Sequence, residues 1–233
     1  MATISDNLQA VRARIERAAR GAGRDPDSVA LLAVSKTHPA GAVEEAFAAG
    51  QPAFGENYVQ EALDKMAALG RLQIDWHMIG PLQSNKTRRV AERFGWVHTL
   101  DRGKIARRLS QQRPAGLLPL NVLIQVNVSG ESSKSGVSPV DAIALAQVVA
   151  RLPGLRLRGL MAIPEPGGEM VLQRARFGAV HQLFQTLRAG GLPLDTLSMG
   201  MSDDLEAAIA EGATLVRVGS AIFGQRQRVR DAA

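Results

Sequence analysis

The sequence contains no cysteine among its 233 residues. This excludes a disulfide framework and zinc or iron–sulfur sites with thiolate ligands, and it fits a reducing compartment. Long apolar runs are also missing: none approaches the roughly 20 residues of a membrane span. Residues 1–21 lack the apolar core of a secretory signal. We therefore expect a cytoplasmic protein that does not associate with membranes.

Aromatic residues are scarce, at 4% of the chain, while Lys and Arg outnumber Asp and Glu by 28 to 22. The resulting net charge of +6 could suit nucleic acid or another polyanion. However, the low aromatic content argues against the stacking platforms that bind single strands. The basic residues are also scattered among acidic ones. We expect a solvated basic surface and no nucleic-acid partner, with binding of a small anion left open.

Familiar nucleotide and hydrolase motifs are absent too. The sequence has no GxxxxGK[ST] phosphate loop and no GxSxG nucleophile elbow. Gly21 and Gly23 follow a helical pattern instead of a strand, so the dinucleotide-binding fingerprint does not apply to them.

What the chain does contain is a repeated alternation of short apolar runs, polar turns and helical patterns. Such alternation is typical of β/α units with a parallel sheet, and eight runs in this length predict a closed (β/α)₈ TIM barrel. We expect residues 1–233 to form a single domain, with 226–233 as a frayed tail. The predicted strands are Val29–Val34, Pro52–Gly55, Ile74–Ile79, Trp96–Leu100, Leu120–Val128, Leu155–Ile163, Thr196–Met199 and Thr214–Val218.

One additional helix is predicted before the first strand. An apolar stripe recurs there at helical spacing, and Gly21 and Gly23 are expected to end the helix. The stripe consists of Ile4, Leu8, Val11, Ile15 and Ala19.

Polar residues gather just after the predicted strands, and in a barrel these positions all open on the face that carries active sites. Lys36 follows the first strand, where apolar walls would disfavour its charged form and make it available for Schiff-base chemistry. A surface lysine with its stem along apolar neighbours is the simpler interpretation of the spacing alone.

The end of the last strand is a candidate anion site. Arg217 and Val218 lead directly into Gly219 and Ser220, where backbone amides and a hydroxyl can meet a phosphate. A turn that closes the barrel without a ligand is the equal alternative. The preceding loop adds the hydroxyl of Ser198.

Several other polar residues have structural explanations. Asp203 and Glu206 resemble a capping box for a helix through Ala210, so neither is assigned to catalysis or metal binding. The histidines at strand ends, His38, His77 and His98, lack metal-like spacing. We expect the basic group Lys86, Arg88 and Arg89 to be solvated.

Several motifs taken together resemble the pyridoxal-phosphate homeostasis protein family, which is related to the N-terminal barrel of alanine racemase. The matches span nearly the whole chain and occur in order. They are VSKTHP (34–39), FGENYVQE (54–61), WHMIGPLQSNK (76–86), SSKSGV (132–137), GLMAIPEP (159–166) and LSMGMSDDLEAAIAEGATLVRVGSAIFG (197–224).

The resemblance implies that a single barrel holds pyridoxal 5′-phosphate (PLP). Lys36 matches the lysine that forms an aldimine with the cofactor, and Arg217 matches an arginine that faces the pyridine nitrogen. Asn57 and Met161 match positions near the cofactor ring, and Lys134 matches a position near its phenolic oxygen. The phosphate cradle implied by the resemblance consists of Ser198, Met199, Gly219 and Ser220.

An arginine cannot accept the ring proton that PLP enzymes use to stabilise carbanions. Alanine racemase, whose site this one resembles, also uses a tyrosine from a second domain; we expect no such domain here, and Tyr58 is the only tyrosine in the sequence. We therefore predict a monomeric binding protein that buffers PLP or delivers it to PLP-dependent apo-enzymes, without robust turnover. The alternatives are a PLP-dependent amino-acid racemase or related enzyme, a cofactor-free Schiff-base aldolase, and a module that binds nucleic acid or membrane surfaces.

Overall fold

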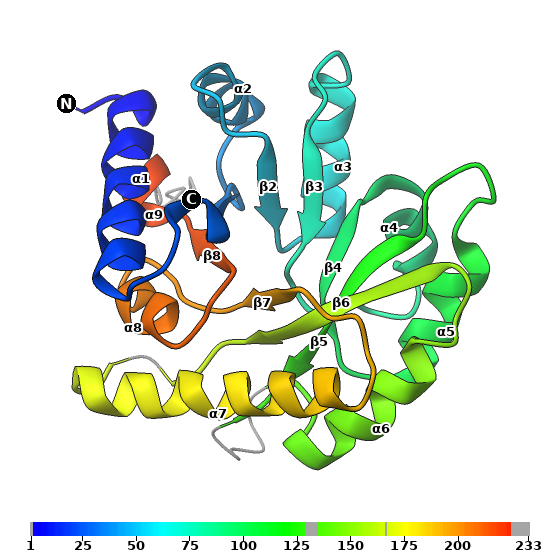
Figure 1. The fold of residues 1–233 in the computed structure, drawn as a ribbon. Helices are drawn as coiled ribbons and strands as arrows, with labels where there is room; N and C mark the ends of the chain where they lie inside the picture. The colour runs from blue at the N-terminus through cyan, green and yellow to red at the C-terminus, as the bar shows by residue number, and fades with distance from the viewer. Residues whose placement is uncertain (1, 129–134, 166, 225–233) are drawn as a thin grey trace, which may run out of the picture.

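The computed structural model describes residues 2–128, 135–165 and 167–224. Eight parallel strands pair in chain order, and β8 pairs with β1 to close a barrel (Figure 1). This confirms the predicted (β/α)₈ fold, and each predicted strand end lies within two residues of the observed one. The predicted tail at 226–233 lies outside the described residues. The strands are β1 (Ala30–Val34), β2 (Ala53–Glu56), β3 (Asp75–Met78), β4 (Trp96–Leu100), β5 (Leu120–Val126), β6 (Leu155–Ala162), β7 (Thr196–Ser198) and β8 (Leu215–Val218).

Helices follow the strands and cover the outside of the barrel (Figure 1). In the described ranges, no helix combines the length and apolar character that crossing a bilayer requires. The helices are α1 (Ile4–Gly21), α2 (Ala40–Ala48), α3 (Val59–Ala68), α4 (Thr87–Arg93), α5 (Gly103–Gln112), α6 (Pro139–Val149), α7 (Met170–Ala189), α8 (Leu205–Ala210) and α9 (Ser220–Phe223), and a 3₁₀ turn spans Pro26–Ser28.

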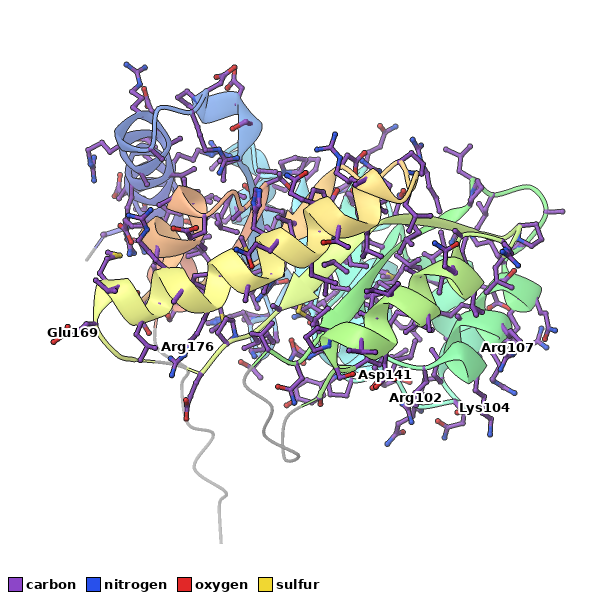
Figure 2. The ribbon with its side chains drawn as sticks, turned by 60° about the horizontal axis from the view of Figure 1, so that its bottom comes forward. Arg102, Lys104, Arg107, Asp141, Glu169 and Arg176 are labelled. Carbon is purple, nitrogen blue, oxygen red and sulfur yellow. The ribbon has the colours of Figure 1, made fainter. Side chains whose placement is uncertain are left out.

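The beginnings of the helices after α1 mark one end of the barrel, because each of them starts soon after a strand has ended. Labelled side chains from the starts of α5, α6 and α7 lie along one edge of the molecule in Figure 2, among them Lys104, Asp141 and Glu169. The loops at this end connect the carboxyl ends of the strands to the helices. This is the end at which barrels place their functional sites.

The predicted helix before the first strand is confirmed as α1. Thr3 and Asp6 form a capping box at its beginning, and Gly23, with φ of 68°, follows its end. Its buried stripe is Leu8, Val11, Ile15 and Ala19. This helix lies beside α8 and α9 and therefore supports the last two loops of the barrel (Figure 1).

The predicted capping box at Asp203 and Glu206 is wrong. Helix α8 begins one residue later than a box at Asp203 requires, and its N-cap residue is Asp204. The Oδ1 atom of Asp204 accepts a hydrogen bond from the Met201 amide at 2.6 Å. Glu206 pairs instead with Arg14 of α1, so a long-range ion pair replaces the local bond that the sequence pattern suggested. The helix does end at Ala210, as predicted.

Candidate functional site

A cavity of about 280 Å³ lies at the carboxyl ends of the strands. Its volume is near the lower end of the range of about 300–1,000 Å³ that is usual for small-molecule sites. Loops that follow strands from both halves of the chain contribute to its lining. The lining residues are Val34, Lys36, His38, Asn57, Ile79, Ile163, Met201, Ser202, Asp203, Arg217, Gly219, Ser220 and Gly224.

A larger hollow of about 740 Å³ lies on the outer helices, between α3 and α4. Lys86, Arg89 and Glu92 are among its lining residues. Its lining comes from α3, from α4 and from the two residues that precede α4, and no strand residue is part of it. Lys86, Arg88 and Arg89 are exposed, as predicted. The smaller cavity is therefore the candidate functional site, because predicted site residues such as Lys36 and Arg217 line it.

The backbone around Lys36 is held on both sides. Before it, the Ser35 hydroxyl donates to Glu56 Oε1 at 2.6 Å. After it, Thr37 adopts a left-handed φ of 66°, and its amide donates to Glu61 Oε1 at 2.5 Å. A non-glycine residue in this region is uncommon and needs support from its surroundings.

Lys65 of α3 connects these supports. Its Nζ atom donates to the Ser35 carbonyl, to Glu56 Oε1 and to Glu61 Oε1, each at 2.7 Å. The Glu56 and Lys65 side chains are 0% and 6% exposed. Burial raises the pKa of Glu56, although hydrogen bonds from Lys65 and Ser35 oppose the change. The buried network therefore fixes the turn from which the Lys36 side chain enters the cavity.

Two hydroxyls and a glycine form the corner between the last two strand ends. The Oγ atoms of Ser202 and Ser220 lie 3.4 Å apart. At Gly219 a Cβ atom would lie 3.1 Å from the Val34 carbonyl and 3.3 Å from Val34 Cβ, so the backbone here approaches the first strand closely. Both serines line the cavity, and their hydroxyls can donate to one anion placed between them.

Arg217 lies at the floor of the cavity and is 4% exposed. Its Nη1 atom donates to the carbonyl and Oγ atoms of Ser198, both at 2.7 Å, and Nη2 donates to the Ala162 carbonyl at 2.9 Å. Burial lowers the pKa of Arg217 to about 10, against the opposing effect of Asp204. The guanidinium remains charged at neutral pH and is held rigidly by these three acceptors.

Asn57 shows that the cavity fits a polar ligand. Its Oδ1 atom is buried and has no hydrogen-bond partner in the protein. Because an unsatisfied buried acceptor is costly, a ligand group or solvent is expected to donate to it. Gly80 packs directly against this residue, since a Cβ there would lie 2.2 Å from the Asn57 carbonyl oxygen.

Five predicted site residues line the cavity, and three do not. Met161 and Met199 are fully buried, and the Met199 amide donates to the Leu215 carbonyl. Ser198 is also fully buried, and its hydroxyl lies beneath Arg217. The residues that line it are Lys36, Asn57, Arg217, Gly219 and Ser220.

Sequence reasoning did not assign Ser202 and His38, which the structure places in the cavity lining. Ser202 follows the end of β7, where a side chain can turn toward the mouth. The ring of His38 packs against Phe223 at 5.0 Å between centroids. Position 134, the predicted partner of the phenolic oxygen, lies outside the described residues. Among the described residues, no cluster of His, Asp or Glu could hold a metal ion.

The sequence and the fold both match known proteins. The family model for the N-terminal domain of alanine racemase matches residues 7–227. The pyridoxal phosphate homeostasis protein of Pseudomonas aeruginosa is 64% identical over 226 residues, which cover 97% of each chain.

Solved structures extend this comparison. PipY of Synechococcus elongatus, solved with PLP bound, is 39% identical with a TM-score of 0.84, and the match covers 95% of this chain and 100% of PipY. Alanine racemase from Corynebacterium glutamicum shares the fold at 17% identity, with a TM-score of 0.72. That match covers 97% of this chain but 64% of the racemase.

The match to the family model over residues 7–227 places this barrel in the class of alanine racemase N-terminal domains. Within that class, the chain belongs to the pyridoxal phosphate homeostasis protein family.

Proposed function

We propose that this protein binds PLP and serves in the homeostasis of the cofactor inside the cell. The observation that carries the proposal is the convergence of Lys36 with the Ser202, Gly219 and Ser220 corner on one cavity. An aldehyde with a phosphate at its other end requires an amine and an anion site on opposite sides of one small pocket. The membership of the chain in its family, and a relative solved with PLP bound, support this assignment.

Six of the lining residues, and three buried residues beneath them, have roles in this proposal. Bound PLP supplies an aldehyde carbon, and Lys36 Nζ bonds to it with loss of water. Ser202 and Ser220 donate hydroxyl hydrogens to the phosphate, and Gly219 leaves room for it. Arg217 faces the pyridine nitrogen, and Asn57 receives a hydrogen bond within the cavity. Ser198 and the two methionines then support the cavity from below.

We propose further that the protein holds the cofactor without robust turnover. A carboxylate partner would accept a hydrogen bond from a protonated ring nitrogen, but Arg217 can only donate, so the ring nitrogen stays unprotonated and the ring remains a weak electron sink. Tyr58, the only tyrosine, is 58% exposed and is not among the lining residues. Transfer to PLP-dependent apo-enzymes is the use that we propose for cofactor held in this way.

The proposal predicts a yellow protein whose colour depends on Lys36. Wild-type protein mixed with PLP should gain the imine absorbance, and borohydride should fix the cofactor to the Lys36 peptide in a mass spectrum. The Lys36→Ala variant should lose both signals, while Lys104→Ala, a change of an exposed lysine on α5, should keep them. A wild-type protein that stays colourless with added PLP would refute the proposal.

The racemase alternative predicts a different result. Amino acids in deuterated water would exchange their α-proton faster with the PLP-loaded protein than with free PLP. We expect no acceleration, because the ring environment disfavours a carbanion. Exchange that the Lys36→Ala variant abolishes would establish the enzyme alternative.

A further inference from the structure

A chain of hydrogen bonds runs through the interior of the barrel below the cavity. It starts at Arg217, whose Nη1 donates to Ser198 Oγ at 2.7 Å. Ser198 Oγ lies 3.0 Å from His98 Nδ1, and His98 Nε2 lies 2.9 Å from His77 Nδ1. His77 Nε2 then lies 3.2 Å from Asp75 Oδ2. We call these five residues the axial relay.

The two ends of the axial relay lie at opposite ends of the barrel. Arg217 lines the cavity at the carboxyl ends of the strands. Asp75 is the first residue of β3, at the other end, and its side chain is 48% exposed. Between them His77 is 3% exposed, while His98 and Ser198 are fully buried. The relay is therefore a buried polar path from the cavity floor to solvent on the far side.

Protonation chemistry gives the relay one direction. Burial is the main cause that lowers the pKa of His98 well below its usual value, and the nearby Arg217 cation adds to it, so this ring is neutral. Arg217 can only donate, and ionised Asp75 can only accept. Because Asp75 only accepts, His77 Nε2–H donates to it, and His77 Nδ1 is then an acceptor. His98 Nε2–H therefore donates to His77 Nδ1, and His98 Nδ1 accepts from the Ser198 hydroxyl. With neutral rings, only this arrangement satisfies every member.

The surroundings of the relay support an ionised Asp75. Burial raises its pKa, but hydrogen bonds from His77 and Trp96 outweigh that effect, so the net shift is downward. Trp96 stacks on the His77 ring at 5.1 Å. The guanidinium of Arg158 lies 4.8 Å above the Trp96 ring and also pairs with Asp195.

We propose that the axial relay positions Arg217 and transmits the charge of Asp75 to the cavity floor. Each donor in the path points away from the cavity, so the carboxylate polarises both rings and the Ser198 hydroxyl toward itself. Ser198, His98, His77 and Asp75 are positioning residues, because they act on the cofactor site through Arg217. The relay's relevance to the cofactor rests on the proposed function, but its hydrogen-bond direction can be tested without PLP.

The first test is nitrogen NMR of the histidine side chains in PLP-free protein. We expect each of the two rings, His98 and His77, to carry its proton on Nε2, as the relay direction requires. Asp75→Asn should shift the ring nitrogens of His98, which Asp75 does not touch. Asp27→Asn removes the same charge from an exposed residue that precedes β1, and it should leave them unchanged. A proton on Nδ1 of His98, or equal shifts in both variants, would overturn the relay.

The second test uses the PLP-loaded protein and its absorbance between pH 5 and 10. Loss of the Asp75 carboxylate makes the cavity floor more positive, so Asp75→Asn should lower the pH midpoint of the absorbance change. Asp27→Asn should not move it. An unchanged pH midpoint in the Asp75→Asn variant would show that the charge of Asp75 is not transmitted to the cavity. Absence of any PLP absorbance, with the expected NMR result, would instead refute the proposed function and leave the relay standing.

Discussion

At the scale of single residues, the position of Lys36 depends on a buried ion pair that lies outside the cavity. Lys65 holds Glu56 and the Ser35 carbonyl, and through Glu61 it reaches the left-handed Thr37. Removal of one partner from such a pair is costly because it leaves the other charge buried without compensation. The ion pair is therefore better explained as a support for the Lys36 turn than as a source of net stability.

Lys65→Met should destabilise the protein by about 3–5 kcal/mol, since Glu56 would lose its cation. It should also weaken imine formation at Lys36, because the turn would lose its anchor. Adding Glu56→Gln should recover much of the stability, since the amide oxygen still accepts from Ser35 without a charge. Denaturant unfolding and PLP titration measure the two effects, with Lys104→Met as the exposed control. Equal stability of the Lys65→Met variant and the wild type would contradict this account.

Glu56 also predicts a pH dependence. Its folded pKa is raised above the usual 4.5, mainly by burial. The folded state therefore keeps a proton that the unfolded chain has lost, and the unfolding free energy falls as pH rises from about 4.5 through the folded pKa. Above that value the contribution is constant. Glu56→Gln should flatten this slope in urea unfolding measured across the same pH range, and an identical slope would contradict the assignment.

At the scale of elements, α1 does more than cover the barrel. Arg14 Nη1 donates to the Ser202 carbonyl at 2.6 Å, and the same guanidinium pairs with Glu206 of α8. Asn7 Nδ2 donates to the Ile222 carbonyl of α9 at 2.9 Å. This helix thus holds both loops of the anion corner.

Arg14→Met should weaken PLP binding several-fold, because Ser202 would lose its tether. The cost in stability should stay within about 1 kcal/mol, since the Arg14–Glu206 pair is partly exposed. Arg20→Met, which breaks an exposed pair with Glu16 in the same helix, should change neither binding nor stability appreciably. PLP titration by absorbance and thermal unfolding separate the two effects. Equal PLP affinity in both variants would show that the tether is unimportant.

The elements were predictable because each strand is a short segment rich in apolar residues, although β3 and β6 also carry charged ones, and polar turns bound these segments, which is a local signal. The different positions of Ser198 and Ser202 relative to the cavity could not be predicted in this way. Ser198 still lies within β7, where its side chain turns into the barrel, whereas Ser202 lies beyond the strand end. The axial relay was also beyond prediction, because His77 and His98 meet only through the register of neighbouring strands.

At the scale of the whole molecule, the closed barrel leaves no strand edge of the sheet open for pairing with another chain. The net charge of +6 adds mutual repulsion between copies. We therefore expect a monomer of 24.9 kDa, with or without PLP. Sedimentation velocity at several concentrations measures the mass, and a concentration-independent dimer would contradict the expectation.

The contact between Arg14 and Ser202 joins residues 188 positions apart, and the one between Asn7 and Ile222 joins residues 215 apart. Contacts of such separation form late, because the loops between them must first be ordered. On the ribosome, Lys36 would emerge long before the serines that face it. A nascent chain would thus present the amine without its anion receptor, and selective capture of the cofactor would begin only after synthesis has reached the final strand.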